Sequence, residues 1–232
     1  MMLKKMLGVS AVIVATAVPA TAGATLMTSD VGYTGPFLNL SAQANGQYNF
    51  TFGPVNLPGG MTFTRDPSTA SNSGLGAVLG QGGYGLAANG SFGGSAVYAG
   101  LDGSSGWMRF VLSAPVSQFG AYLNYATPGY GDAMIEVLDQ AGNVIESHNL
   151  ATEAPISTPG GFNQFAFRGI DYGQTAIWGL QLRDSYVLAA ASSTGDPTNP
   201  NDPGNGIPEP ESILLLALGL VGIGLNRRRA RR

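Results

Sequence analysis

The chain has 232 residues, with no cysteine and one histidine, which excludes a disulfide scaffold, covalent haem attachment, cysteine–zinc sites and histidine-rich metal sites. Its net charge of −3 hides an uneven distribution, because residues 23–206 contain four arginines, twelve acidic residues and no lysine, a net charge of −8. Such an acidic surface argues against nucleic acid or anionic lipid as a partner.

The first 22 residues have the pattern of a secretory signal peptide. Two lysines precede an apolar run over residues 6–18, and the small residues Ala20 and Ala22 supply the cleavage site. We therefore predict a signal peptide over residues 1–22, recognised by the Sec translocon and cut by signal peptidase after Ala22. A cut two residues later is the alternative.

Residues 23–190 predict one all-β domain, because short β-rich runs alternate with clusters of glycine, asparagine and proline and no stretch has a helical period. The expected strands are 48–52, 61–64, 107–112, 119–125, 133–138, 144–148, 162–167, 176–182 and 186–189. Alternation within 119–125 places Phe119, Ala121, Leu123 and Tyr125 on one face.

Two further expectations concern this domain. Residues 139–143 predict a hairpin turn in which Gly142 or Asn143 adopts a positive φ. The glycine-rich segment 74–100 predicts loose strands and loops, since glycine loses much conformational freedom on ordering. After the domain, residues 191–206 are rich in Pro, Gly, Asn and Asp and predict a flexible linker.

The last 26 residues, 207–232, combine three features of a sorting signal. A short motif, Pro208-Glu209-Pro210, precedes an apolar run over residues 213–225. A basic tail follows, consisting of Arg227, Arg228, Arg229, Arg231 and Arg232. Positive charge beside a membrane segment is retained in the cytoplasm, and thirteen residues form a helix of about 20 Å, short for a bilayer core of about 30 Å.

This tail resembles a PEP-CTERM signal, the tag that exosortases read in Gram-negative bacteria that secrete exopolysaccharide. The resemblance implies transient residence in the inner membrane, cutting near Pro208-Glu209-Pro210 by exosortase, and delivery to the cell surface or extracellular matrix. An ordinary C-terminal membrane anchor is the alternative.

The body carries a second resemblance. Residues 113–123, 135–145, 162–167 and 177–182 are similar to the jelly-roll domains found ahead of PEP-CTERM tags, which look like galactose-binding-type carbohydrate modules. The resemblance implies a jelly-roll-type β-sandwich. Family members often end with an IDN or LDD strand, and this chain departs from that pattern with Arg-Asp-Ser-Tyr at residues 183–186.

Glycan contact is one chemistry that the candidate residues suggest. Tyr130 stands in a loop where its ring can stack on a sugar, and Asp132 beside it can accept sugar hydroxyls. We expect Trp107 and Trp178 to fill the core, as large aromatics on strands usually do. One structural calcium ion is the cofactor to consider, bound by loop aspartates. These are Asp132, Asp139, Asp171 and Asp184.

Catalytic constellations are weakly represented. His148, the single histidine, has no nucleophile elbow to serve, and GQGGYG at 80–85 lacks the strand-to-helix context of a dinucleotide site. The acid pairs Asp132–Glu136 and Asp171–Asp184 have no fixed separation, which glycoside hydrolysis requires. We therefore expect a non-enzymatic exported protein of the exopolysaccharide or biofilm matrix; the alternative is a carbohydrate-binding module with a defined glycan ligand and structural calcium.

Overall fold

The computed structural model describes residues 23–45, 47–68, 77–81, 84–86, 89–92, 96–101, 103–158 and 165–193. The predicted signal peptide, the predicted apolar helix at 213–225, the sorting motif and the arginine tail lie outside these residues. So does the predicted linker beyond residue 193.

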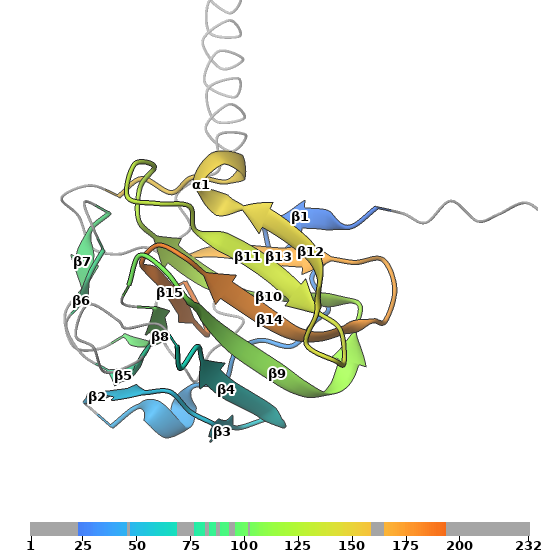
Figure 1. Cartoon of the computed structure of the whole chain (residues 1–232), viewed down its shortest axis with the longest axis horizontal. Coiled ribbons are helices and arrows are strands. Elements are labelled where there is room, and N and C mark those ends of the chain that lie inside the picture. The colour runs from blue at the N-terminus through green and yellow to red at the C-terminus, as the bar shows by residue number, and fades with distance from the viewer. Residues whose placement is uncertain are drawn as a thin grey trace, which may run out of the picture.

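Two antiparallel sheets pack face to face (Figure 1). The seven-stranded sheet has the spatial order β1 (Thr25–Met27), β13 (Ala166–Asp171), β10 (Gln118–Tyr125), β15 (Val187–Ala190), β8 (Val97–Leu101), β5 (Ala77–Gln81) and β2 (Tyr48–Thr51). The six-stranded sheet has the order β12 (Val144–Asn149), β11 (Met134–Leu138), β14 (Ile177–Arg183), β9 (Trp107–Val116), β4 (Met61–Arg65) and β3 (Val55–Leu57).

Three short elements complete the described fold. They are the strand pair β6 (Tyr84–Gly85) and β7 (Ser91–Phe92), the 3₁₀ turn η1 (Ser41–Gln43) and the one-turn helix α1 (Leu150–Glu153). Asn149 caps α1, since its side chain accepts a hydrogen bond from the backbone N–H of Ala151 at 3.0 Å. A side-chain acceptor at this position satisfies one of the free N–H groups of the first turn.

Strands β8 to β15 form an eight-stranded jelly roll, which confirms the predicted fold class. Numbered 1 to 8 along the chain, they stand in the order 6-3-8-1 in one sheet and 5-4-7-2 in the other. This is the double Greek key of a jelly roll. The remaining strands extend it, with β5 and β2 beyond β8, β4 and β3 beyond β9, and β1 beyond β13.

The main core lies between the sheets and follows the alternation of the strands. Phe119, Ala121, Leu123 and Tyr125 of β10 all point into it, as predicted. From the facing sheet, alternate residues of each strand enter the same core, and one ring pair illustrates the contact: the centroids of Phe63 and Phe110 lie 5.5 Å apart. The predicted turn between β11 and β12 is also present, with Gly142 at a φ of +84°.

The glycine-rich segment corrects one prediction. Instead of loose strands, β5 and β8 are interior strands of the seven-stranded sheet, and every residue of β8 is buried. A second apolar cluster covers the outer face of that sheet, where Tyr98 and Tyr122 pack with Phe167. Because both faces are covered, the strands show no hydrophobic alternation, and small residues suit the space. Of the strand expected at 162–167, residues 162–164 lie outside the described residues, and the strand that the structure describes there is Ala166–Asp171.

Candidate functional site

Three loops of the jelly roll meet at one end of the sandwich. The β14–β15 turn links them, because Asp184 donates its backbone N–H to the carbonyl of Gly106 at 2.8 Å, from the β8–β9 loop. The hydroxyl of Ser185 donates to the carbonyl of Tyr130 at 3.1 Å, from the β10–β11 loop. Binding residues often occupy loops that a rigid scaffold positions in this way.

The β14–β15 turn is strained. Asp184, Ser185 and Tyr186 have φ values of 53°, 39° and 24°, a region that L-residues other than glycine rarely adopt. Each such residue costs roughly 1–3 kcal/mol and persists only where the surroundings hold it, often at functional sites. This turn is the segment that departs from the pattern of the jelly-roll domains that the body resembles, and that departure was the only sign of the turn in the sequence.

The structure places both predicted glycan-contact residues on the surface of this end. Tyr130 is 49% exposed and Asp132 is also exposed, both in the β10–β11 loop. The ring of Tyr130 is therefore free to meet a ligand, while its carbonyl is held by Ser185.

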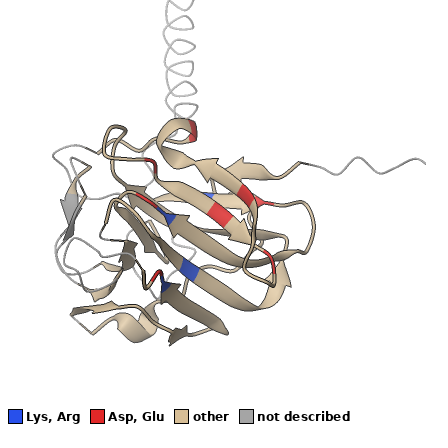
Figure 2. Cartoon of the chain, viewed as in Figure 1, with Lys and Arg blue, Asp and Glu red and all other residues tan. Residues whose placement is uncertain are grey.

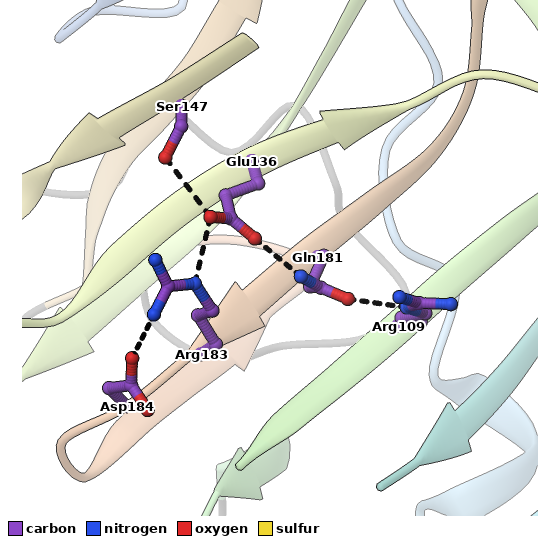
Figure 3. Close-up of polar contacts among 6 residues, drawn as sticks. All are labelled: Arg109, Glu136, Ser147, Gln181, Arg183 and Asp184. Atoms are coloured by element: carbon purple, nitrogen blue, oxygen red, sulfur yellow. Dashed lines mark hydrogen bonds and ion pairs between the residues drawn. The ribbon is translucent and has the colours of Figure 1, made fainter. Parts of the chain in front are cut away.

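Next to this end, a line of polar side chains crosses the outer face of the six-stranded sheet (Figure 3). We call it the polar row, and it consists of Ser147 on β12, Glu136 on β11, Gln181 on β14 and Arg109 on β9. Strand register sets it, because Glu136 lies opposite both Ser147 and Gln181, and Gln181 lies opposite Arg109.

Hydrogen bonds connect the polar row from end to end. Glu136 accepts from the hydroxyl of Ser147 at 3.0 Å and from the amide of Gln181. The carbonyl oxygen of Gln181 accepts in turn from Nε of Arg109. Arg183 joins the row at the loop end, with its Nε 2.8 Å from Oε1 of Glu136 and its Nη1 bonded to Asp184. The sheet face and the strained turn are therefore one connected surface.

The pKa values of Arg183 and Arg109 are shifted in opposite directions. The hydrogen bond to Glu136 is the main cause that raises the pKa of Arg183. Burial is the main cause that lowers the pKa of Arg109, partly offset by the charges of Glu136 and Asp66. Figure 2 shows that the basic segments of the fold stand apart from one another rather than forming a patch.

The two tryptophans correct another prediction. Neither Trp107 nor Trp178 belongs to the core clusters, and both are half-buried. Trp107 lies opposite Arg183 on the outer face of the sheet, and the guanidinium of Arg109 stacks over its ring at 4.2 Å. A cation over the face of an indole is attracted by the ring quadrupole. The sheet face thus presents an aromatic–arginine pair beside the polar row.

The calcium candidates are not brought together. Asp139 is bonded within its own turn, accepting from the backbone N–H of Asn143 at 2.8 Å, and Asp184 is bonded to Arg183. Asp171 accepts from the side chain of Gln118 at 2.8 Å. Across the described ranges, no three acidic or histidine side chains converge as a metal site would require.

The acid pairs considered for glycoside hydrolysis do not form a catalytic arrangement either. Asp171 ends β13 beside the start of β14, whereas Asp184 follows the end of β14, so the length of a seven-residue strand lies between them. Glu136 accepts three hydrogen bonds within the polar row. His148 contacts Glu153 at 2.7 Å, an acid that also accepts from the N–H of Asn149 at the start of α1.

Comparisons with known proteins address the tail. Residues 206–230 match the model of the PEP-CTERM protein-sorting motif, and the match covers no part of the sandwich. Searches of curated proteins and of solved structures gave no significant match. In the part of the chain that the structure describes, no helix has the length and apolarity to cross a membrane. The chain carries at residues 206–230 the C-terminal sorting signal of exosortase substrates, so it is an exported protein with exosortase as its processing partner.

Proposed function

We propose that the mature protein is a non-enzymatic component of the cell surface or extracellular matrix of a Gram-negative bacterium, associated with its exopolysaccharide or biofilm. The sorting motif at 206–230 is the observation that carries this proposal. It directs export, and the family resemblance links exosortase to exopolysaccharide secretion. The jelly roll provides a rigid body that makes contacts in the matrix.

The surface chemistry agrees with a binding rather than a catalytic role. The carboxylate of Glu136 is occupied by three donors, and the other acids proposed for hydrolysis do not form a pair. An acidic, lysine-free body also suits a soluble matrix component better than a partner of nucleic acid.

Intact-mass spectrometry of the protein from the native cell surface, matrix and medium tests this proposal. We expect loss of the first 22 residues and of the chain beyond the Pro208-Glu209-Pro210 motif, with the processed form enriched in the exopolysaccharide fraction. A matched variant with alanine at these three positions should keep its C-terminus. Wild-type protein that remains intact through Arg232 would contradict processing and indicate a membrane anchor, and processed protein absent from the matrix would contradict the matrix role.

A carbohydrate-binding module with a defined ligand is the second candidate. The exposed loop ring of Tyr130 beside Asp132 favours it. Aromatic side chains with one apolar face and one polar end are well suited to sugars. A glycan array with the wild-type protein and the Tyr130→Ala variant would distinguish this role, because a defined module should select a few related glycans and lose them on substitution.

A further inference from the structure

Two asparagines of the sandwich precede a glycine, and the fold treats their side chains differently. They are Asn45, between η1 and β2, and Asn89, between β6 and β7. An asparagine before glycine is open to attack on its own side chain by the next main-chain nitrogen, because glycine has no Cβ to obstruct the approach. Which of the two asparagines reacts therefore depends on where the fold places its side chain.

Asn45 is exposed, and its side chain is turned toward the main chain that follows it. Its Oδ1 accepts a hydrogen bond from the backbone N–H of Gln47 at 3.1 Å. This bond closes an Asx turn, in which the side-chain carbonyl folds back over the backbone. The same N–H would stabilise negative charge on Oδ1 when a nucleophile adds to Cγ, as the donors of an oxyanion hole do.

Asn89 is fully buried, and both polar atoms of its side chain are engaged. Its Nδ2 donates to Oδ1 of Asn124 at 3.0 Å and to the carbonyls of Tyr125 at 2.6 Å and Ile156 at 3.1 Å. Its Oδ1 accepts from the backbone N–H of Thr158 at 2.6 Å. The amide that would have to turn and lose its nitrogen is therefore held in place, and it becomes reactive only when the segment opens locally.

We propose that Asn45 is a site of spontaneous deamidation in the exported protein and that the fold protects Asn89 from the same reaction. The main-chain nitrogen of Gly46 bonds to Cγ of Asn45, the Cγ–Nδ2 bond breaks, and ammonia leaves with the proton of the attacking nitrogen. Water then opens the cyclic succinimide at either carbonyl, which gives aspartate or isoaspartate. Water is the one co-reactant that these steps need.

Either product alters the chain beside an edge strand. Both add a negative charge to a body whose net charge is already −8, and isoaspartate also adds a carbon to the main chain shortly before β2. The carbonyl of Gln47 accepts from the backbone N–H of Gln81 at 2.8 Å, which extends the pairing of β2 with β5. The modification therefore acts on the end of this pairing. This inference goes beyond the proposed function and does not depend on it.

Peptide mapping by mass spectrometry tests the proposal on the purified mature protein, incubated at mildly alkaline pH. The peptide with Asn45 should become a mixture of isoaspartate and aspartate at least about tenfold faster than the peptide with Asn89, which reacts only through local opening. Asn45→Gln is the matched variant, and its peptide should stay unchanged because the longer side chain closes a ring much more slowly. Asn205, a third asparagine before glycine, lies outside the described residues and is read on a separate peptide.

The same mapping in guanidinium chloride separates the effect of the fold from that of the sequence. Unfolding releases the partners of Asn89, so the two peptides should then react at similar rates. Equal rates in the folded protein, or no reaction at Asn45, would overturn the proposal. A difference that persists after unfolding would overturn the protective role of the fold, and aspartate without isoaspartate would overturn the cyclic route.

Discussion

Glu136 and Arg183 form an ion pair, 2.8 Å from Oε1 to Nε, on the outer face of the six-stranded sheet. The side chain of Glu136 is only 4% exposed, whereas that of Arg183 is 38% exposed. The carboxylate is therefore the buried centre of the polar row, and the arginine reaches it from the solvent side. Its other donors are Ser147 and Gln181.

Replacing Glu136 with alanine should lower the free energy of unfolding by about 2 kcal/mol. The change removes an acceptor shared by three donors, and hydrogen bonds to charged groups contribute about 1.5–3 kcal/mol; the exposure of Arg183 places the loss toward the lower end. Urea denaturation measures the effect. Ser147→Ala, which removes a single neutral donor, should cost no more than about 1 kcal/mol. Equal losses in the two variants would contradict a central role for Glu136.

Arg168 should contribute more to the stability of the fold than Arg109, which lies on the outer face of the six-stranded sheet. It lies inside the sandwich, where Nε donates to the hydroxyl of Tyr125 at 3.1 Å. Its Nη atoms donate to the carbonyls of Phe167 at 2.7 Å, Ala154 at 3.2 Å and Thr28 at 3.3 Å. It therefore connects β13 to α1, to β10 and to the segment after β1.

We expect Arg168→Met to destabilise the protein by about 3 kcal/mol or more, because several buried acceptors lose their donor and each unsatisfied group costs about 1–3 kcal/mol. Arg109→Met is the matched control. At a partly exposed site, it loses one donor to Gln181 and the stacking of its guanidinium on Trp107, and it should cost about 1–2 kcal/mol. Guanidinium chloride or urea melts of both variants measure the difference, and similar losses would contradict the connecting role of Arg168.

Asn89 ties the short β6–β7 pair to the jelly roll. It is fully buried, and its side-chain amide donates to the carbonyl of Tyr125 at 2.6 Å and to the side chain of Asn124 at 3.0 Å. Its carbonyl oxygen accepts from the backbone N–H of Thr158 at 2.6 Å. One side chain thus satisfies groups from two distant segments.

Asn89→Ala should therefore cost about 3 kcal/mol, since it leaves at least two of these buried groups unsatisfied. Asn149→Ala provides a comparison, because it removes only the cap of α1 and should cost about 1 kcal/mol. Hydrogen exchange adds a local readout: loss of Asn89 should increase exchange around Thr158. Unchanged exchange around Thr158 would show that the hydrogen bonds of Asn89 do not hold this segment in place.

Sequence alone predicted the strands that have one face in the core. In β10, ring and aliphatic residues alternate with the residues of the other face, and the prediction of its inward face was confirmed. Prediction from sequence failed for β5 and β8, because both faces of these strands are buried and apolar residues no longer alternate with polar ones. The burial of Asn89, within the same glycine-rich segment, was equally hidden, since its partners are distant in sequence.

The candidate site shows a similar limit. Glu136, Gln181 and Arg109 each stand between apolar neighbours, so their outward direction can be predicted. Their adjacency cannot, because it depends on the jelly-roll order that places β11, β14 and β9 side by side. The same order explains why the core prediction for Trp107 was wrong: its strand position faces outward, where Arg109 covers its ring.

Acid should weaken the fold partly through Glu153. The hydrogen bond with His148, followed by that from the N–H of Asn149, lowers the pKa of this carboxyl below its ordinary value of 4.5. The pKa of Asp139 is also lowered, chiefly by the side chain of Asn143. A carboxylate whose pKa is lower in the folded state adds stability above its unfolded pKa, and this stability is lost as the pH falls through the folded pKa.

The urea midpoint of the wild type should therefore fall between about pH 5 and about pH 3, and Glu153→Gln should reduce that fall because its neutral side chain does not titrate. Asp139→Asn should act in the same direction through an independent turn. The two variants share no partner, so their effects should add in the double variant. Parallel pH profiles for the wild type and both variants would show that neither carboxylate contributes, and that the acid sensitivity of the fold arises elsewhere.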